Sequence, residues 1–153
     1  MTFFGEQQWF FFALIFFGAI GYIALIRWRD RIWIDRQYGI HLAKMMSFGV
    51  SYFGLASETG KRRHSSGFLL LLPDRLVYRS RFKRVKLEII GDRITGISHG
   101  TSHGGVKLHQ PVIQIAFQTS DNKRDAVAFK VPYPTQWMAA IRTGFIDSKS
   151  DHV

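Results

Sequence analysis

At 153 residues, the chain has room for one ordinary domain and a short additional segment, so a two-domain organisation is disfavoured. The absence of cysteine excludes disulfides, thiolate metal sites and a cysteine nucleophile. A formal net charge of +10, from 21 Lys and Arg side chains against 11 Asp and Glu, favours an anionic partner such as nucleic acid or a lipid headgroup surface, but it does not indicate a fold.

The first predicted element is a membrane span over residues 7–26, QQWFFFALIFFGAIGYIALI, which follows a short tail over residues 1–6. None of these 20 residues is charged, and at about 1.5 Å of rise per residue they cover the roughly 30 Å hydrocarbon core of a bilayer. The core helix of a soluble protein usually keeps a polar stripe, and this segment has none. We therefore expect one transmembrane helix.

The residues that flank the span indicate its orientation. No Lys or Arg precedes it, whereas several follow it closely, and the basic flank of a membrane helix stays cytoplasmic. We therefore expect a single-pass protein of the cell membrane with an outward N-terminus and a cytoplasmic C-terminal domain. A cleavable signal peptide is disfavoured, because Glu6 is the only charged side chain before the apolar run. The side chains expected at the membrane interface are Trp9, Arg27, Trp28, Arg29, Arg31 and Trp33.

Residues 27–47 form a basic and aromatic juxtamembrane segment. Arg alternates with Trp and Ile in RWRDRIWIDRQYG, so a helix could continue past the bilayer or lie along its surface. A positive flank that only stops translocation is the simpler interpretation, and it is favoured. The following residues 48–57 contain too many glycines for a helix and are interpreted as a strand.

From Gly67 onward, apolar residues recur with a period of two between closely spaced turn signals, which is typical of an antiparallel sandwich or barrel. In the segment RLVYRSR, Leu76 and Tyr78 face one side of a strand, and the arginines face the other side. The last two strands are joined by a turn at residues 121–123 and should pair as a hairpin. With the strand at 48–57, the predicted strands cover residues 68–72, 75–81, 85–89, 94–97, 112–119 and 125–131.

A helix begins near Pro134, because proline is favoured in the first turn of a helix. It places Trp137, Ala140, Ile141 and Phe145 on one stripe, which should cover a sheet. A polar tail over residues 147–153 follows. The predicted fold class is therefore a single transmembrane helix plus a mainly-β domain of about seven antiparallel strands, capped by a C-terminal helix.

This layout resembles the pleckstrin-homology-like (PH-like) domains, in particular their bacterial, GRAM-like members. The residues that carry the resemblance are SGFLLLLPDRLVY (66–78), LEIIGDRITGI (87–97) and PTQW (134–137), which opens the last helix. The resemblance covers residues 48–146 and departs from the family pattern at Pro73, where a threonine is expected. It implies a barrel or sandwich in a non-catalytic adaptor domain that docks on membranes or proteins, while one fold hosts many functions.

Two basic clusters flank the apolar run FLLLL. They precede one strand and surround a turn two strands later, so they could converge at one edge of the barrel as a basic rim. The residues of this basic rim are Lys61, Arg62, Arg63, Arg79, Arg81, Lys83 and Arg84. A rim close to the bilayer would gain about 1 kcal/mol per charge against anionic lipid, whereas the alternative is a solvated surface without a specific partner.

Other functions are weaker. Aromatic residues among arginines, as in RSRFKR, could stack nucleic-acid bases, but the membrane span makes nucleic acid an unlikely partner, and we expect these aromatics to alternate as core residues do. His99, His103 and His109 suggest a metal, but they come without a carboxylate, and His103 is expected in a glycine loop. No nucleophile elbow or paired carboxylates support an enzyme.

The sequence thus predicts a membrane-anchored, non-catalytic interaction or scaffold module on the cytoplasmic face, without a cofactor. Its expected partners are the bilayer, anionic lipid headgroups, and other membrane or cytoplasmic proteins. The alternative is an accessory structural subunit of a larger membrane complex, and a membrane-bound enzyme or metal protein is the third possibility.

Overall fold

The computed structural model describes residues 3–58, 64–82 and 85–150, with side chains of the first helix from Gln7 onward. The chain divides into two compact units, Met1–His41 and Leu42–Val153, which we describe in turn.

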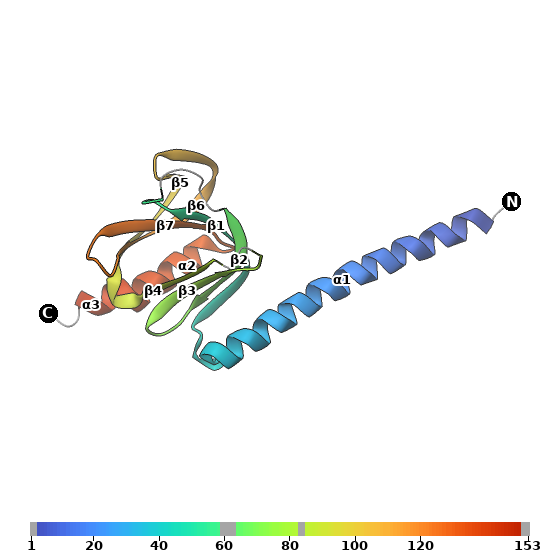
Figure 1. Ribbon diagram of the computed structural model, residues 1–153, viewed down its shortest axis with the longest axis horizontal. Helices are drawn as coiled ribbons and strands as arrows, with labels where there is room; N and C mark the ends of the chain where they lie inside the picture. The colour runs from blue at the N-terminus through green and yellow to red at the C-terminus, as the bar shows by residue number, and fades with distance from the viewer. Residues whose placement is uncertain (1–2, 59–63, 83–84, 151–153) are drawn as a thin grey trace. The chain divides into compact units, whose positions relative to one another are not determined.

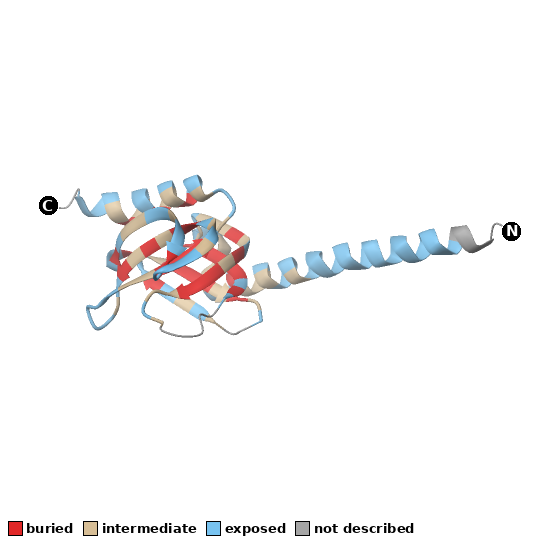
Figure 2. Ribbon diagram, turned by 90° about the horizontal axis from the view of Figure 1, so that it is seen from above, coloured by how far each residue is buried: buried red, intermediate tan, exposed pale blue. Residues whose placement is uncertain are grey.

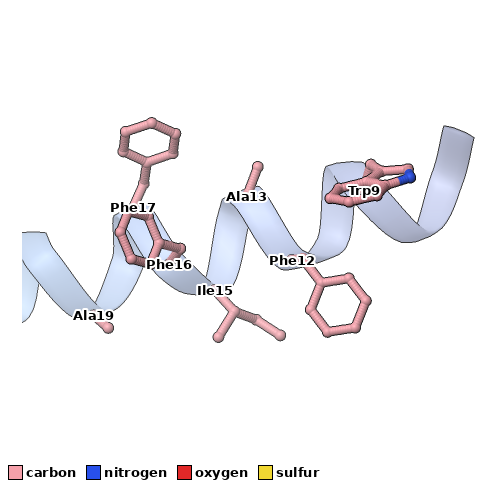
Figure 3. A pocket seen from close by; sticks show the side chains of 7 residues that line it. All are labelled: Trp9, Phe12, Ala13, Ile15, Phe16, Phe17 and Ala19. Carbon is pink, nitrogen blue, oxygen red and sulfur yellow. The ribbon is translucent and has the colours of Figure 1, made fainter.

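The first unit is dominated by one helix, α1 (Phe3–Tyr38), of 36 residues. The aromatic and aliphatic side chains of its first half project in several directions around the axis, as Figure 3 shows. The span is exposed along its length, and by length and composition the helix is sufficient to cross a membrane. The prediction of a long apolar N-terminal helix is confirmed.

The helix continues for 12 residues beyond the predicted span and ends at Tyr38. The juxtamembrane segment is therefore helical up to that residue. Gly39 ends the helix with a φ of 72°, a conformation that glycine adopts without strain. Asp35 accepts hydrogen bonds from the two residues that follow the helix: its carbonyl accepts from Gly39 N at 3.0 Å, and its Oδ1 accepts from Ile40 N at 3.0 Å.

After a 3-10 turn, η1 (Ile40–Leu42), the second unit forms one antiparallel sheet with the strand order β4-β3-β2-β1-β7-β6-β5 (Figure 1). A short 3-10 turn, η2 (Gly91–Arg93), joins β4 to β5. The seven strands are β1 (Met45–Leu55), β2 (Ser65–Leu71), β3 (Arg75–Ser80), β4 (Lys86–Ile90), β5 (Ile94–His103), β6 (Val106–Gln118) and β7 (Arg124–Lys130). The predicted number of strands, their antiparallel pairing and the 121–123 hairpin are confirmed.

The sheet curls around a main core (Figure 2). Ile89 on β4 and Ile94 on β5 lie on the two edge strands, and yet both belong to one buried cluster with Val50 of the central strand β1. The two edges are also joined by only three residues, Gly91–Arg93. A flat sheet could not satisfy either condition, so the strands form a partly open barrel. The other members of the core are Tyr52, Leu69, Leu71, Leu76, Tyr78, Ile113, Ile115, Phe117, Val127, Phe129, Trp137, Ile141 and Phe145.

β1 pairs with β2 on one side and with β7 on the other, and two glycines lie where its pairing is irregular. Gly49 and Gly54 have φ values of 71° and 88°, and the register shifts at the same two places. Such irregularities bend a strand and increase its twist. The strand begins at Met45, three residues earlier than the sequence indicated, because Met45 and its neighbours pair with the end of β2.

The apolar run on β2 is buried on both faces of the sheet. Leu69 and Leu71 enter the core, whereas Phe68 and Leu70 are buried on the opposite face. On β3, Leu76 and Tyr78 face the core as predicted. The opposite face is not uniformly positive, however, because Val77 lies fully buried between the arginines of that strand.

The expectation that His103 lies in a glycine loop is wrong, because His103 is the last residue of β5. Only Gly104 and Gly105 turn, with φ values of 52° and 80°, and the residues on either side form the long β5–β6 hairpin. The hairpin lacks an apolar alternation because most of its outer half is exposed on both faces, so the period-two signal of a half-buried strand is missing.

The C-terminal helix begins at Pro134, as predicted. It consists of α2 (Pro134–Ile141), a π-helical segment η3 (Arg142–Asp147) and the short α3 (Ser148–Ser150). Trp137, Ile141 and Phe145 are buried in the core, and Ala140 is partly buried against it. The Trp137 Nε1–H donates to Ser47 Oγ on β1 at 3.0 Å, which satisfies the only polar atom of that side chain.

Candidate functional site

The two connections that carry the basic clusters leave the sheet at the same end. The β1–β2 connection lies beyond the pair Tyr52 and Ser65, and the β3–β4 connection lies beyond the neighbouring pair Gly67 and Ser80. Arg81 N donates to Ser66 O at 2.9 Å, so the flanks of the two clusters are hydrogen-bonded to each other. We call this end of the domain, with residues 56–64 and 79–86, the loop end.

Two residues of the predicted basic rim are described, and both lie at the loop end. Arg79 pairs with Phe68 on β2 and with Lys86 on β4, and it is partly buried. Arg81 is partly buried in the turn that follows β3. The other rim residues lie outside the described residues, namely Lys61, Arg62, Arg63, Lys83 and Arg84.

The positive charge of the chain is concentrated in two places. In the sequence, residues 56–64 and 79–86 contain eight Lys and Arg against one carboxylate, Glu58, which accounts for a surplus of seven. The juxtamembrane segment from Arg27 to Lys44 holds five against two, a surplus of three. The remaining residues contain eight of each sign, so the whole net charge of +10 belongs to these two segments. An electrostatic partner would therefore meet the protein at the loop end or beside the helix.

A buried network lies directly beneath the loop end. Tyr78 OH is 3.0 Å from Ser65 Oγ and donates to Ser65 O at 3.2 Å, and its ring stacks on Tyr52 at a centroid distance of 5.1 Å. Burial raises the pKa of Tyr78, and this effect exceeds the opposing one of the Ser65 hydrogen bond. Ser80 closes the β3–β4 turn, since its Oγ accepts from Val85 N at 2.8 Å. The strand ends that carry the loop end are thus held in place by buried or partly buried hydrogen bonds.

The opposite end of the domain, where β1 begins, receives the chain from the helix, and we call it the tether end. Lys44 N donates to Leu71 O at 2.8 Å, and Gly91 N donates to Asp74 O at 2.8 Å, so the β2–β3 turn and η2 also lie here. The charges at this end are balanced. Arg75 contacts Asp74 at 2.9 Å and Glu88 at 3.1 Å, and the hydrogen bond from Arg75 is the main reason that the pKa of Asp74 is lowered.

The predicted interface residues all lie on α1. Trp9 and Trp28 are strongly exposed, as are Arg27, Arg29 and Arg31. Trp33 is half-buried. Its ring lies edge-on to the ring of Tyr38, and the two ring centroids are 6.0 Å apart. The spacing of the tryptophans on a regular helix is compatible with the headgroup positions that were expected for them.

The three histidines do not converge. His103 is the last residue of β5, only 2% exposed, and its Nε2 lies 2.9 Å from Gly54 O. His99 and His109 are exposed on β5 and β6, and His109 adopts a φ of 56°. Among the described residues there is no group of three His, Cys, Asp or Glu side chains placed to hold a metal ion. His103 instead links the β5–β6 hairpin to β1.

Neither of two hollows in the described part forms an enclosed ligand site. One borders α1 alone, between the side chains shown in Figure 3, and faces the surroundings of the helix. The other, of about 250 Å³, lies at the open corner between the end of β4 and the β6–β7 turn, where Glu88, Arg93 and Ser120 contribute polar groups.

Sequence reasoning missed one residue at the loop end. Phe82 was expected to pack as a core residue, but it is 78% exposed. The signal was present in the sequence: Phe82 follows the last paired residue of β3, where the in–out alternation of the strand has ended. A residue beyond the ladder is no longer directed to the core by the pleat.

No protein-family model matches this chain, and neither does any curated protein. Solved structures share its fold. The C-terminal domain of an unknown protein from Leishmania infantum matches with a TM-score of 0.51 and 16% identity, over 76% of this chain and 97% of that one. A chain from the structure of the 8S snRNP assembly intermediate matches with a TM-score of 0.50 and 7% identity, over 72% of this chain and 84% of that one. At these identities the likeness concerns the fold alone.

Proposed function

We propose that this protein is a membrane-anchored, non-catalytic interaction module with a PH-like domain on the cytoplasmic face, and that the loop end docks on anionic lipid of the same membrane. The strand order, the partly open barrel and the C-terminal helix with its buried Trp137 support the PH-like assignment. The apolar helix α1 supports the anchor. Anionic lipid attracts nearby Lys and Arg by about 1 kcal/mol per side chain, so three contacts would favour docking by about 3 kcal/mol.

The observation that carries the proposal is the concentration of seven surplus charges in residues 56–64 and 79–86, which connect strands that end on the same side of an otherwise nearly balanced domain. The hydrogen bond between Arg81 N and Ser66 O holds the flanks of the two clusters together. A solvated surface without a partner has no reason to collect its charge at one end, because mixed charges serve solubility equally well.

The chain between the span and the domain is long enough for docking on the same membrane. The loop end and the tether end are separated by β1, whose 11 residues extend over at most about 36 Å. Residues 27–38 add about 18 Å as helix, η1 adds about 6 Å as a 3-10 turn, and residues 39, 43 and 44 add at most about 10 Å. The maximal reach of about 34 Å is close to the separation, so the loop end can return to the bilayer.

Vesicle flotation of residues 42–153, a unit with its own core, tests the proposal. We expect binding to vesicles that contain anionic lipid but not to neutral vesicles. Binding should weaken as salt is raised from about 0.1 M to 1 M, which shortens the Debye length from about 10 Å to 3 Å. Absence of binding to either vesicle, by a fragment that circular dichroism shows to be folded, would overturn the docking proposal.

Matched charge reversals show whether the location of the charge matters. Arg62→Glu with Arg81→Glu changes one residue of each cluster and should abolish flotation. Arg93→Glu with Arg142→Glu makes the same change in net charge at exposed positions outside the loop end and should retain most of the binding. Equal losses in both variants would mean that only net charge matters, and would contradict a docking surface.

An accessory subunit of a larger membrane complex is the second candidate function. It is favoured by Gly18 and Gly21, around which nothing lies within 4 Å, so another helix could approach α1 closely there. Mild-detergent purification of the full chain separates the two functions. A stoichiometric membrane-protein partner that is lost with Gly18→Ile and Gly21→Ile would favour the subunit.

A further inference from the structure

Phe82 is the most exposed large apolar side chain that the structure describes in the domain. It is 78% exposed, against 70% for Tyr133 and 49% for Ile90. It lies at the tip of the β3–β4 hairpin, after Arg81 and before Lys83 in the sequence. An isolated exposed apolar residue is ordinary on a protein surface. Its position at the centre of the most basic segment of the chain is the feature that requires an explanation.

The chemistry of this position fits the boundary between headgroups and acyl chains. Arginine and lysine side chains remain among phosphates while their aliphatic stems reach toward the apolar layer, and an aromatic ring between them can enter that layer. A soluble acidic protein would also attract the arginines, but it would not favour an uncovered ring at the tip of a narrow hairpin over a pocket or groove. The helix α1 is long and apolar enough to cross a membrane, and a domain anchored in this way always has the lipid surface within reach.

We propose that Phe82 inserts into the acyl-chain boundary of the anionic membrane on which the loop end docks, so that docking has an apolar component that salt does not screen. This inference rests on the proposed function, because insertion requires the loop end to reach the bilayer. Ile90, at the other end of β4, is the matched control: it is an exposed apolar residue of the same hairpin at the tether end.

The absence of native cysteine allows a single label at any chosen position of the full chain. The full chain is reconstituted in nanodiscs that contain phosphatidylcholine alone or phosphatidylcholine with phosphatidylserine. A donor dye on Ser66→Cys, an exposed position beside Arg81, reports docking by energy transfer to a headgroup-labelled acceptor lipid. A separate fluorophore on Phe82→Cys or Ile90→Cys reports insertion by quenching from a nitroxide on the acyl chain.

We expect docking in the anionic nanodiscs, acyl-chain quenching at position 82 and none at position 90. In the Ser66→Cys background, Phe82→Ala should lower the ratio of docked to undocked domain about tenfold, as expected for losing part of the burial of one aromatic ring. Ile90→Ala should leave this ratio unchanged. At 1 M salt, the docking that remains should depend on Phe82.

The outcomes separate the two proposals. Energy transfer without quenching at position 82, and without an effect of Phe82→Ala, would overturn insertion and leave electrostatic docking intact. The absence of energy transfer in anionic nanodiscs would overturn docking itself and insertion with it. Equal quenching at positions 82 and 90 would also overturn insertion, because it would mean that the domain contacts the acyl chains equally with its loop end and its tether end.

Discussion

Gly67 on β2 is required by the close approach of β3. A Cβ at this position would overlap with the carbonyl oxygen of Arg79, which belongs to the backbone and cannot move aside. Gly96 on β5 is a suitable control. It is also a strand glycine without a positive φ, but a Cβ added there would have no atom within 4 Å.

We expect Gly67→Ala to lower the free energy of unfolding by about 3 kcal/mol, because the β2–β3 ladder must separate locally. Gly96→Ala should leave it unchanged or raise it by up to about 1 kcal/mol, because alanine loses less backbone entropy than glycine. Urea unfolding of both variants measures the difference. Equal free energies of unfolding for the two variants would contradict this prediction, because they would mean that β2 and β3 can move apart to accommodate the methyl group.

Tyr78 makes stability depend on alkaline pH. Burial raises its pKa above the ordinary value of 10.0, so the folded state holds this proton more tightly than the unfolded state does. The resulting stabilisation is complete below about pH 10 and is lost as the pH rises through the pKa of the folded state.

The free energy of unfolding should therefore fall above about pH 10, and it should fall less steeply in Tyr78→Phe, which cannot ionise. Tyr133→Phe is the control, because it removes a tyrosine hydroxyl from an exposed position. The comparison uses denaturant midpoints across the alkaline range. A Tyr78→Phe slope equal to that of the control would contradict the assignment.

At the scale of elements, the C-terminal helix is fixed to the sheet at several points. Trp137 is fully buried and donates to Ser47 Oγ, and Lys149 Nζ donates to the carbonyl of Ile94 at 3.0 Å. Gly91 leaves room for the Phe145 ring, which a Cβ at that position would overlap. The helix is thus hydrogen-bonded to the central strand β1 and to the edge strand β5, and it contributes to the core between them.

Ser47→Ala should lower the free energy of unfolding by about 1 to 3 kcal/mol, because it leaves the buried Trp137 indole N–H without its acceptor. Ser98→Ala changes an exposed serine on β5 and should remain within about 0.5 kcal/mol of the unaltered protein. Tryptophan fluorescence should respond to the first variant only. A negligible effect of Ser47→Ala would mean that water replaces the lost hydroxyl.

At the scale of the whole molecule, apolar and charged residues are segregated along the chain. Residues 7–26 contain no charged side chain, whereas the positive charge lies in later segments. Residues 7–26 of α1 have no polar face, and contact between their exposed aromatic surface and water is unfavourable. A lysine or arginine at the centre of a membrane helix costs about 2.5 to 3.5 kcal/mol on insertion scales. Residues 7–26 contain no lysine or arginine, and the first positive residue is Arg27, as this cost would require of a membrane span.

Single cysteines test this topology in intact cells with a membrane-impermeant maleimide. We expect labelling of Thr2→Cys before permeabilisation and labelling of Ser120→Cys only after it. Charged residues at Ile15 and Phe16 should release the full chain from the carbonate-resistant membrane fraction. Immediate labelling of both cysteines, or of Ser120→Cys alone, would contradict the predicted orientation.

The sequence by itself determined the apolar helix, the strands with a regular alternation and the amphipathic C-terminal helix, because each depends on local periodicity. It did not reveal the outer half of the β5–β6 hairpin, whose exposed residues follow no alternation, or the burial of His103. Only the tertiary structure decided which connections share an end of the barrel, because strand pairing is non-local. For the same reason, Phe82 could be recognised as an exposed tip residue only after the end of the β2–β3 ladder was known.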